Sequence, residues 1–332
     1  MPGSIDRSDI AVIGAGPCGI GVGIAARHAV RTCTLFDKGS VASSIGHYPV
    51  FMTFFSTAER LEIGDVPFTI AGEKPTRREA IRYYQRLVRH FDLDVRQFHT
   101  VESVSGSRGR FIIETRSLAG LTATHETAHV VIATGYFDHP NLLGVPGEEL
   151  PHVSHGYREG HRYFRQRVLI VGGGNSAVDA ALELHRSDAR VTIVHFEASL
   201  DTGVKPWVLP DITARIRDGD VNAVYRSRVT RISPTSVTLR DVDTGETREL
   251  ETDHVLLMTG YTPDPALLRS LGVTFDARTG KPHHNPATMQ TNVPGVFIAG
   301  VVAAGNDANK VFIENGRHHG RLILECLRSG TS

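Results

Sequence analysis

The stretch Gly14-Ala15-Gly16-Pro17-Cys18-Gly19 follows a short apolar run, Ile10–Ile13, and precedes a segment with a helical pattern. The apolar run is typical of a buried parallel strand. In this setting Gly14 permits a tight turn, Gly16 lets a pyrophosphate approach the backbone, and Gly19 lets the helix pack against the sheet. Free N–H groups at the start of the helix then face the phosphates. The stretch therefore predicts a strand–turn–helix unit that binds a dinucleotide.

A second predicted strand, Thr32–Phe36, follows the helix and ends directly before Asp37. In nucleotide-binding folds of this kind, an acidic residue at the end of the second strand accepts hydrogen bonds from the ribose hydroxyls. The alternative is an ordinary glycine-rich turn between a strand and a helix, without a ligand. The position of Asp37 favours nucleotide binding over that alternative.

The same arrangement occurs a second time in the chain. The stretch Gly172-Gly173-Gly174-Asn175-Ser176-Ala177 follows the apolar run Val168–Val171, and a further strand, Val191–Val194, comes after the next helix. This strand ends at His195, which stands where the first copy has Asp37. Two such units predict two dinucleotide sites that are related but not equivalent.

The composition is that of an ordinary globular protein with two domains. The chain has 332 residues, of which 40% are hydrophobic and 22% charged, and its 36 Lys and Arg balance its 36 Asp and Glu. This balance leaves no basic surface for nucleic acid. Three cysteines, an odd number, indicate a reducing compartment rather than a disulfide scaffold. The polar first nine residues contain no signal-peptide core, and glycines interrupt the apolar stretch 10–26. We therefore expect a cytoplasmic protein without nucleic-acid or membrane partners.

The order of the predicted elements places one domain inside another. Each half of the chain closes with a strand followed by Thr-Gly-Tyr, at Thr134–Tyr136 and at Thr259–Tyr261. A last strand, Val296–Gly300, and a helix over 311–327 remain for the first sheet. The prediction is an α/β fold with two Rossmann-like, three-layer dinucleotide-binding domains. One domain, residues 143–262, is inserted into a discontinuous domain formed by residues 1–142 and 263–332.

The remaining segments predict elements that complete these domains. Thr76 and Glu79 form a capping-box pattern at the start of a helix that extends to Phe91. The segment Ser43–Phe68 is irregular and rich in aromatic residues, as functional loops often are. The other expected elements are two antiparallel meanders and the strands that follow them: Phe98–Val104, Arg110–Thr115 and Ala123–His129 before the strand Val130–Ala133, and residues 228–250 before the strand His254–Met258.

Several short runs have no role in generic nucleotide binding. They are GPCG (16–19), HYP (47–49), TFFS (53–56), IGDVPF (63–68), NSAVDAALEL (175–184), KPW (205–207), TGY (259–261), FIENGR (312–317) and His319-Gly320. With these runs the chain resembles the bacillithiol-disulfide reductases, within the two-dinucleotide-binding-domain flavoproteins of the thioredoxin-reductase type. The similarity extends over nearly the whole chain.

The resemblance implies that the discontinuous domain binds FAD and that the inserted domain binds NADPH or NADH. NAD(P)H then reduces FAD by hydride transfer, and reduced FAD passes two electrons to the disulfide of a low-molecular-weight thiol. On the FAD side the implied cofactor-binding residues are Gly14, Gly16, Pro17, Gly19, Asp37, Lys38, Ser44, His47, Thr53, Thr134, Gly135, Gly300, Val301 and Ile313. On the nicotinamide side they are Gly172, Gly174, Asn175, Ser176, Ala177, His195, Lys205, Thr259, Gly260 and Tyr261. The family also suggests a homo-oligomer.

Cysteine positions depart from the thioredoxin reductases. The inserted domain contains no cysteine, so the chain is not a dithiol thioredoxin reductase. The thiol of interest is Cys18, at a helix N-terminus where the dipole favours a thiolate. We predict that Cys18 is the catalytic residue and attacks the substrate disulfide. The alternative is that the turn only needs a small residue beside the pyrophosphate.

The identity of the nicotinamide donor is left open by the residues after His195. NADPH-specific relatives often have arginines there that bind the 2′-phosphate, whereas this chain has Phe196 and Glu197. The Glu197 carboxylate would repel the 2′-phosphate. Lys205 and Arg226 are candidate cations that could replace the missing arginines. NADPH is favoured by the resemblance, and NADH is the rival.

Two other function classes remain as alternatives. The segment Val145–Tyr157 is similar to a linker motif of flavin monooxygenases, although its leading aromatic residue is missing. A flavin-bound redox sensor without turnover is the second alternative, but it has little need of a second nucleotide fold. The 17 histidines show no zinc-ligand spacing, so no metal site is predicted.

Overall fold

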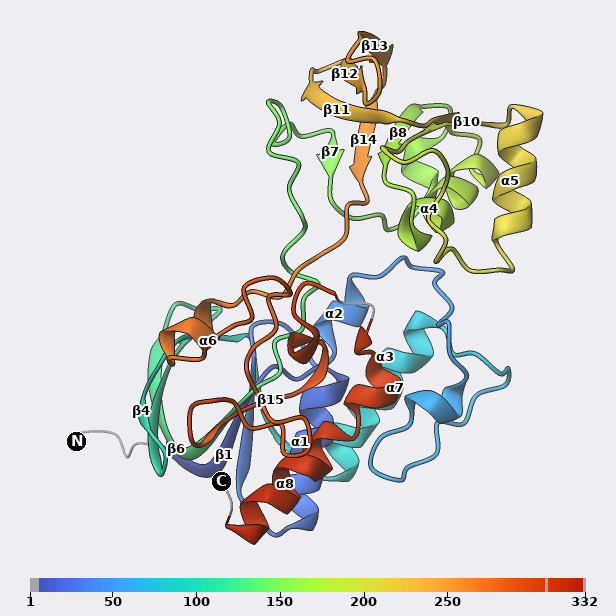
Figure 1. Cartoon of the computed structure of the whole chain (residues 1–332). Coiled ribbons are helices and arrows are strands. Elements are labelled where there is room, and N and C mark those ends of the chain that lie inside the picture. Colours follow the sequence, from blue (N-terminus) through green and yellow to red (C-terminus); the bar gives the residue numbers. More distant parts are fainter. Residues whose placement is uncertain (1–5, 308–309, 331–332) are drawn as a thin grey trace. The chain divides into compact units, whose positions relative to one another are not determined.

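The computed structural model describes residues 6–307 and 310–330 (Figure 1). The chain divides into two units. The first unit contains the residues up to His139 together with those from Tyr261 onward, and the second contains Pro140–Gly260. Each unit is built around its own sheet with a glycine motif at the carboxyl end of one strand.

The first unit has a mostly parallel sheet at its centre. Within the described residues its strand order is β3-β2-β1-β6-β5-β4, and β15 pairs with β6 as well. Strands β1 (Asp6–Ile13), β2 (Cys33–Asp37) and β3 (Asp94–Gln97) run parallel to one another, and β1 is also parallel to β6 (Thr122–Ile132). The predicted last strand is β15 (Val296–Ile298), and its parallel pairing with β6 confirms that it returns to the first sheet.

Strand β6 corrects the predicted meander. The third meander strand and the strand Val130–Ala133 form one continuous strand, because nothing in the sequence between them breaks the extended backbone. Its first half pairs antiparallel with β5 (Arg110–Ser117), which pairs antiparallel with β4 (His99–Ser107). Its second half pairs with β15 over Val130–Ile132. The meander is therefore an extension of the central sheet.

Helices cover the faces of this sheet. α1 (Pro17–His28) begins with the glycine motif, and α3 (Arg77–His90) has the predicted capping box: the Glu79 N–H donates to the Thr76 hydroxyl, and the Thr76 N–H donates to the Glu79 carboxylate. Short helical segments complete the unit: α2 (Ser43–Gly46), η1 (Ala58–Leu61), α6 (Ala266–Ser270) and η3 (Gly300–Ala304).

The prediction of one continuous helix over residues 311–327 is wrong. The structure has α7 (Ile313–Gly316) and α8 (His319–Ser329), separated by Arg317 and His318. Gly316 is buried, and a Cβ on it would lie 2.7 Å from Cys18 Sγ. The packing against Cys18 fixes this turn, and glycine has low helix propensity, so the helix ends there.

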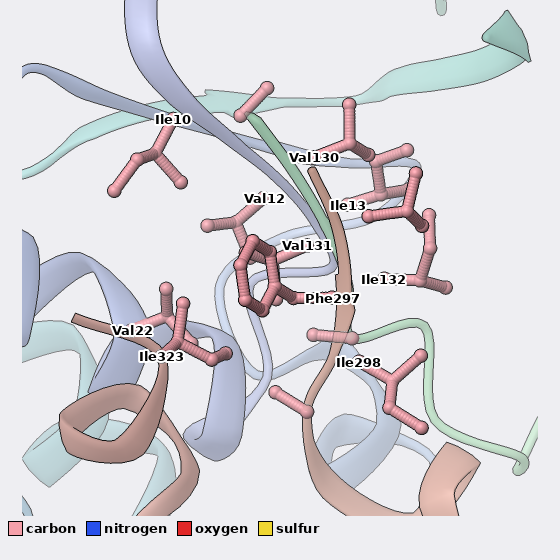
Figure 2. Close-up of a cluster of buried hydrophobic side chains, with 14 of the residues drawn as sticks. Ile10, Val12, Ile13, Val22, Val130, Val131, Ile132, Phe297, Ile298 and Ile323 are labelled. Carbon is pink, nitrogen blue, oxygen red and sulfur yellow. The ribbon is translucent and has the colours of Figure 1, made fainter. Parts of the chain in front are cut away.

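The core of the first unit lies between the central strands and the helices α1 and α8 (Figure 2). Val12 of β1, Val131 of β6 and Phe297 of β15 are fully buried, and Val22 and Ile323 come from the two helices. Burial of each such side chain stabilises the fold by about 1.5–3 kcal/mol. Because the central strands are buried on both faces, their sequences are continuous apolar runs instead of alternating apolar and polar residues.

The second unit repeats the plan. Within the described residues its parallel sheet has the order β10-β9-β8-β14-β7. The predicted strand–helix–strand unit is confirmed as β8 (Arg167–Val171), α4 (Asn175–Arg186) and β9 (Arg190–Val194). The other elements are β7 (Val153–Ser154), η2 (His161–Tyr163), α5 (Leu209–Asp218), β10 (Val221–Val224), β14 (His254–Leu257) and the antiparallel sheet of β11 (Ser227–Ile232), β12 (Ser236–Asp241) and β13 (Thr247–Glu251).

Among the helices of residues 6–307 and 310–330, none is long and apolar enough to cross a membrane.

Val30 carries backbone strain at the end of α1. It follows the C-cap Ala29 with φ of +55°, and its side chain is 92% exposed. The Arg31 N–H donates to the Ala26 carbonyl and the Val30 N–H to the Arg27 carbonyl, which is the Schellman pattern that usually has glycine at this position. A β-branched residue in the left-handed region gains nothing from packing here, so the strain is uncompensated.

We predict that Val30→Gly raises the free energy of unfolding by about 0.5–1 kcal/mol, because relief of strain exceeds the entropy cost of glycine. Denaturant unfolding measures the change. Val242→Gly is the matched control, since Val242 is 45% exposed and does not have a positive φ. The control should destabilise slightly, and an equal loss in both variants would contradict the strain argument.

Candidate cofactor sites

The first glycine motif lies at the carboxyl end of β1 and is held by backbone contacts. Gly14 has φ of +115°, and a Cβ on it would lie 2.2 Å from the carbonyl oxygen of Ala133. A Cβ on Gly19 would lie 1.9 Å from the carbonyl oxygen of Gly14. Both positions therefore require glycine, Gly14 for the turn against β6 and Gly19 for the packing of α1.

Gly16 and Gly135 border open space instead. No heavy atom lies within 4 Å of a Cβ built on either residue. Beside Gly135, the hydroxyl oxygen of Thr134 is buried and has no hydrogen-bond partner among the described residues. Buried polar groups are normally paired, so this orphan hydroxyl and the open backbone fit a polar ligand such as a dinucleotide.

Asp37 is fixed beside the same turn. Its Oδ2 accepts the N–H of Ala15 at 2.8 Å, and its Oδ1 accepts the N–H of Gly39 at 2.8 Å and the hydroxyl of Ser43 at 3.3 Å. Burial raises the pKa of Asp37 above its ordinary value, and these three donors oppose the rise. A carboxylate has about four acceptor sites, so one remains for a ribose hydroxyl.

The other predicted residues of the first site lie on several different elements of the first unit. Pro17 opens α1, and Thr134, Gly135, Gly300 and Val301 follow the parallel strands β6 and β15, whose carboxyl ends share one edge of the sheet. The Lys38 ammonium lies 3.1 Å from Asp138 Oδ2. The remaining predicted residues are Ser44 in α2, His47 with an exposed side chain, Thr53 in a bridge with Thr76, and Ile313 at the start of α7.

Cys18 packs between two glycines. Its Sγ lies 3.1 Å from the Cβ position of Gly300 and 2.7 Å from that of Gly316. Burial, followed by the negative charge of Glu314, raises the pKa of the Cys18 thiol to about 12. The predicted thiolate is therefore wrong for this environment, because desolvation outweighs the helix dipole. The Glu314 carboxylate itself accepts a hydrogen bond from the Ser56 hydroxyl.

His319 lies in the run His319-Gly320 that supports the resemblance, but the sequence did not assign it to the cofactor site. Its Nδ1 accepts the backbone N–H of Gly300 at 3.1 Å, and Gly300 has φ of +77°. Burial, with smaller effects from His284 and His318, lowers the pKa of His319 to about 4. The imidazole is therefore neutral at physiological pH, and Nδ1 is free to accept this hydrogen bond. Only a contact across nineteen residues reveals the pair, so no local pattern could predict it.

The second glycine motif repeats the turn at the carboxyl end of β8. Gly172 has φ of +136°, and a Cβ on it would lie 2.5 Å from the carbonyl oxygen of Met258. A Cβ on Gly173 would lie 2.7 Å from the ring of His195. His195 is buried, and its Nε2 lies 3.1 Å from Asp201 Oδ1 without forming a hydrogen bond.

A segment far from the motif in sequence, residues 199–207, contacts the start of α4. Asn175 connects the two, since its Nδ2 donates to the Gly203 carbonyl at 2.9 Å and its Oδ1 accepts the Lys205 N–H at 2.9 Å. The Asp201 N–H donates to the Gly173 carbonyl at 3.0 Å. The Lys205 ammonium lies 2.6 Å from Asp179 Oδ2. Lys205 is thus paired with a carboxylate of α4, which leaves it a poor substitute for a 2′-phosphate ligand.

The remaining predicted residues of the nicotinamide side fall into both units. Ser176 is exposed and Ala177 is buried in α4. The Thr259 hydroxyl donates to the Asn141 carbonyl at 2.6 Å, and Gly260 has φ of +82°. Tyr261 belongs to the first unit and stacks on Phe137 with ring centroids 4.5 Å apart. In the part of the chain that the structure describes, no group of three or more His, Cys, Asp or Glu could hold a metal ion.

The sequence of the chain matches a known protein family. A family model of the pyridine nucleotide-disulphide oxidoreductases matches residues 11–300. The chain belongs to this family. The match contains both glycine motifs and, apart from the first residues of β1, both central sheets, so the chain is an oxidoreductase with the predicted Rossmann-like fold.

Three relatives give a narrower placement. The chain is 44% identical over 313 residues to the bacilliredoxin reductase Bdr of Bacillus subtilis (strain 168), covering 94% of this chain and 95% of the relative. The solved bacillithiol disulfide reductase Bdr (YpdA) from Bacillus cereus matches with a TM-score of 0.95 and 40% identity, over 98% of this chain and 100% of that one. The same enzyme from Staphylococcus aureus matches with a TM-score of 0.93 and 38% identity, over 99% and 100%. The predicted resemblance is confirmed.

The contrast between Gly16 and Gly19 gives a prediction. Gly16→Ala should fold normally but weaken FAD binding about tenfold or more, because the methyl group occupies the space that a charge-assisted phosphate contact requires. Gly19→Ala should lose the fold instead, since its methyl group would meet the Gly14 carbonyl. Circular dichroism reports the fold, and flavin absorbance and a fluorescence titration report FAD binding. A Gly16→Ala protein with unchanged FAD affinity would contradict the assignment.

The lowered pKa of His319 gives a pH prediction. In the unfolded chain the imidazole binds a proton near pH 6.5, and in the folded protein near pH 4, so its contribution to stability is complete above pH 6.5 and is lost as the pH falls toward 4. The contribution is on the order of 3 kcal/mol.

His319→Asn keeps an acceptor near Gly300 but does not titrate. Unfolding free energies measured from pH 7 to pH 4 should therefore fall less steeply in this variant than in the unmodified protein. His283→Asn is the control, because His283 is exposed and lies on a loop away from Gly300 in sequence. Equal slopes in all three proteins would rule out the assignment to His319.

Proposed function

We propose that this enzyme uses NADPH and FAD to reduce the disulfide of a low-molecular-weight thiol, with bacillithiol disulfide as the substrate. The observation that carries the proposal is the pair of glycine turns formed by the same backbone contact, with open backbone at Gly16 and Gly135 and the orphan Thr134 hydroxyl beside the first turn. The substrate comes from the names of the two solved Bdr structures at 38–40% identity, whereas the Bacillus subtilis relative at 44% identity is named for the reduction of a bacilliredoxin. When bound, FAD accepts a hydride from NADPH and supplies two electrons to the disulfide.

The proposal assigns the residues of each turn to one cofactor. Gly14, Gly16 and Gly19 hold the FAD pyrophosphate, and Asp37 orients the adenosine ribose through its remaining acceptor site. Gly300, fixed by His319, presents its backbone to the flavin end. In the second unit, Gly172, Gly174, Asn175, Ser176 and Ala177 hold the NADPH pyrophosphate at the start of α4.

The overall reaction consumes NADPH, one proton and one disulfide, and it releases NADP⁺ and two thiols. Two thioredoxin-reductase cysteines are not needed for this balance, and the inserted unit has none. In the proposed route the sulfur of Cys18 attacks one sulfur of the substrate disulfide, the disulfide bond breaks, and the proton of the Cys18 thiol goes to the leaving sulfur, which departs as the first thiol. Reduction of the mixed disulfide by two electrons and two protons, the equivalent of NADPH and one proton, would then break the new S–S bond, release the second thiol and restore the Cys18 thiol.

The three free cysteines fit a reducing compartment, and we propose a cytoplasmic homo-oligomer.

One set of anaerobic titrations tests the proposed function. The purified flavoprotein is reduced with NADPH or NADH, and its reoxidation is followed with bacillithiol disulfide, glutathione disulfide, cystine and an oxidised bacilliredoxin. Fast reoxidation by bacillithiol disulfide is expected. Preference for the oxidised protein would replace the small substrate with a protein. If no disulfide reoxidises the flavin and it is reoxidised only when oxygen is then admitted with an organic substrate, the result would indicate a monooxygenase. Absence of bleaching by either donor would indicate a sensor.

The role of Cys18 has a separate test. Cys18→Ala should lower disulfide-dependent NADPH oxidation by more than about 100-fold, because a nucleophile is lost, while flavin binding and flavin reduction by NADPH remain. Cys33→Ala is the matched control, since burial likewise raises the pKa of its thiol to about 12 and it lies in β2. Unchanged turnover of Cys18→Ala with FAD bound would leave the flavin as the direct reductant of the disulfide.

A further inference from the structure

The residues at the end of β9 leave the recognition of the 2′-phosphate without an obvious cation. In a nucleotide bound to the second glycine motif, the adenosine ribose lies at the carboxyl end of β9. His195, the first residue after this strand, is 4% exposed and lies on Gly173, so its ring faces inward. Phe196 and Glu197 follow, and Glu197 has the wrong charge for a phosphate.

A neighbouring segment brings two arginines to this place. The His195 N–H donates to the Val224 carbonyl at 2.9 Å, and the Ser227 N–H donates to the His195 carbonyl at 3.1 Å. The segment from Val224 to Arg228 therefore runs alongside residues 195–197. Arg226 and Arg228 are carried to the end of β9 by this pairing.

The two arginines differ in how their charges are used. Arg226 Nη1 lies 3.4 Å from Asp243 Oδ1, so its charge is partly satisfied. The guanidinium carbon of Arg228 lies 4.3 Å from the ring centroid of Phe196, and Phe196 is 41% exposed. Among the described residues, no carboxylate lies within 4.0 Å of the Arg228 guanidinium. Arg228 is thus an exposed cation that stacks on Phe196 and has no acidic partner within 4.0 Å among the described residues.

The stack on Phe196 explains how Arg228 can act from another strand. An aromatic face holds the planar guanidinium in one orientation and leaves its N–H edge open. That edge matches a phosphate in a bidentate arrangement. Phe196, which stands where the resemblance implies an arginine, then supports the Arg228 guanidinium.

We propose that Arg228, supported by Phe196, recognises the 2′-phosphate of NADPH and makes the enzyme prefer NADPH to NADH. The inference rests on the proposed function, since it assumes that the second glycine motif binds the nicotinamide nucleotide. It assigns the specificity to β11 rather than to the residues directly after β9.

Binding of two nucleotide fragments tests this without turnover. Isothermal titration of the FAD-loaded protein with 2′,5′-ADP and with 5′-AMP measures the contribution of the 2′-phosphate directly. Arg228→Gln should weaken 2′,5′-ADP binding by about 10- to 100-fold and leave 5′-AMP binding unchanged, because a charge-assisted contact is lost. Arg228→Lys should recover part of the loss, and Phe196→Leu should show an intermediate loss.

Arg231→Gln is the control, since Arg231 lies on the same strand, is exposed and should leave both affinities unchanged. Equal loss of both fragments in Arg228→Gln would indicate a structural role and overturn the inference. So would a selective loss in Arg226→Gln with none in Arg228→Gln.

The two proposals fail in different ways. If the unmodified protein binds 5′-AMP as tightly as 2′,5′-ADP and reduces bacillithiol disulfide with NADH, the assignment of Arg228 is wrong and the disulfide reductase stands. If 2′,5′-ADP is preferred through Arg228 but no disulfide reoxidises the flavin, the inference stands and the proposed reaction is wrong.

Discussion

Both units depend on the same backbone contact between a turn and a neighbouring strand. At Gly14 the turn after β1 approaches the Ala133 carbonyl at the end of β6, and at Gly172 the turn after β8 approaches the Met258 carbonyl at the end of β14. Any side chain at these two positions would collide with the next strand. The contact brings the Thr-Gly-Tyr segment that follows each of these strands beside the glycine turn, which explains why both features repeat together. The repetition in sequence is therefore a repeated packing constraint.

The two turns share this contact but differ in what closes them. In the first unit the Asp37 carboxylate accepts hydrogen bonds from the backbone N–H groups of Ala15 and Gly39, so this acid is fixed beside the glycine turn. In the second unit the ring of His195 fills the space over Gly173, and the residue directly after the strand is this histidine instead of an acid. A carboxylate beside this ring, that of Asp201, comes from the segment that contacts α4. The second turn is therefore bordered by groups from segments that are distant in sequence.

The sequence predicted those parts of the fold that depend on near neighbours. Strand, glycine turn and helix lie within about twenty residues, and their patterns identified β1, α1, β8 and α4. The capping box of α3 is equally local. The continuous β6 and the break between α7 and α8 were missed, because the first depends on three partner strands and the second on contact with Cys18. For the same reason the pairs His319–Gly300 and Arg228–Phe196 have no signal in sequence.

Cys18 shows how a correct local rule can be outweighed by burial. A helix N-terminus stabilises a nearby negative charge by about 0.3–1 kcal/mol, and by up to about 2 kcal/mol in a partly buried geometry. A rise in the pKa of Cys18 from 9.0 to about 12 corresponds to a cost on the order of 4 kcal/mol for the thiolate. The dipole is too weak to offset this cost, and Glu314 adds to it. A phosphate bound at the same helix N-terminus would compete for the same N–H groups and add further negative charge. In the proposed attack on a disulfide the Cys18 thiol therefore begins protonated, and its proton is transferred to the leaving sulfur as the disulfide bond breaks.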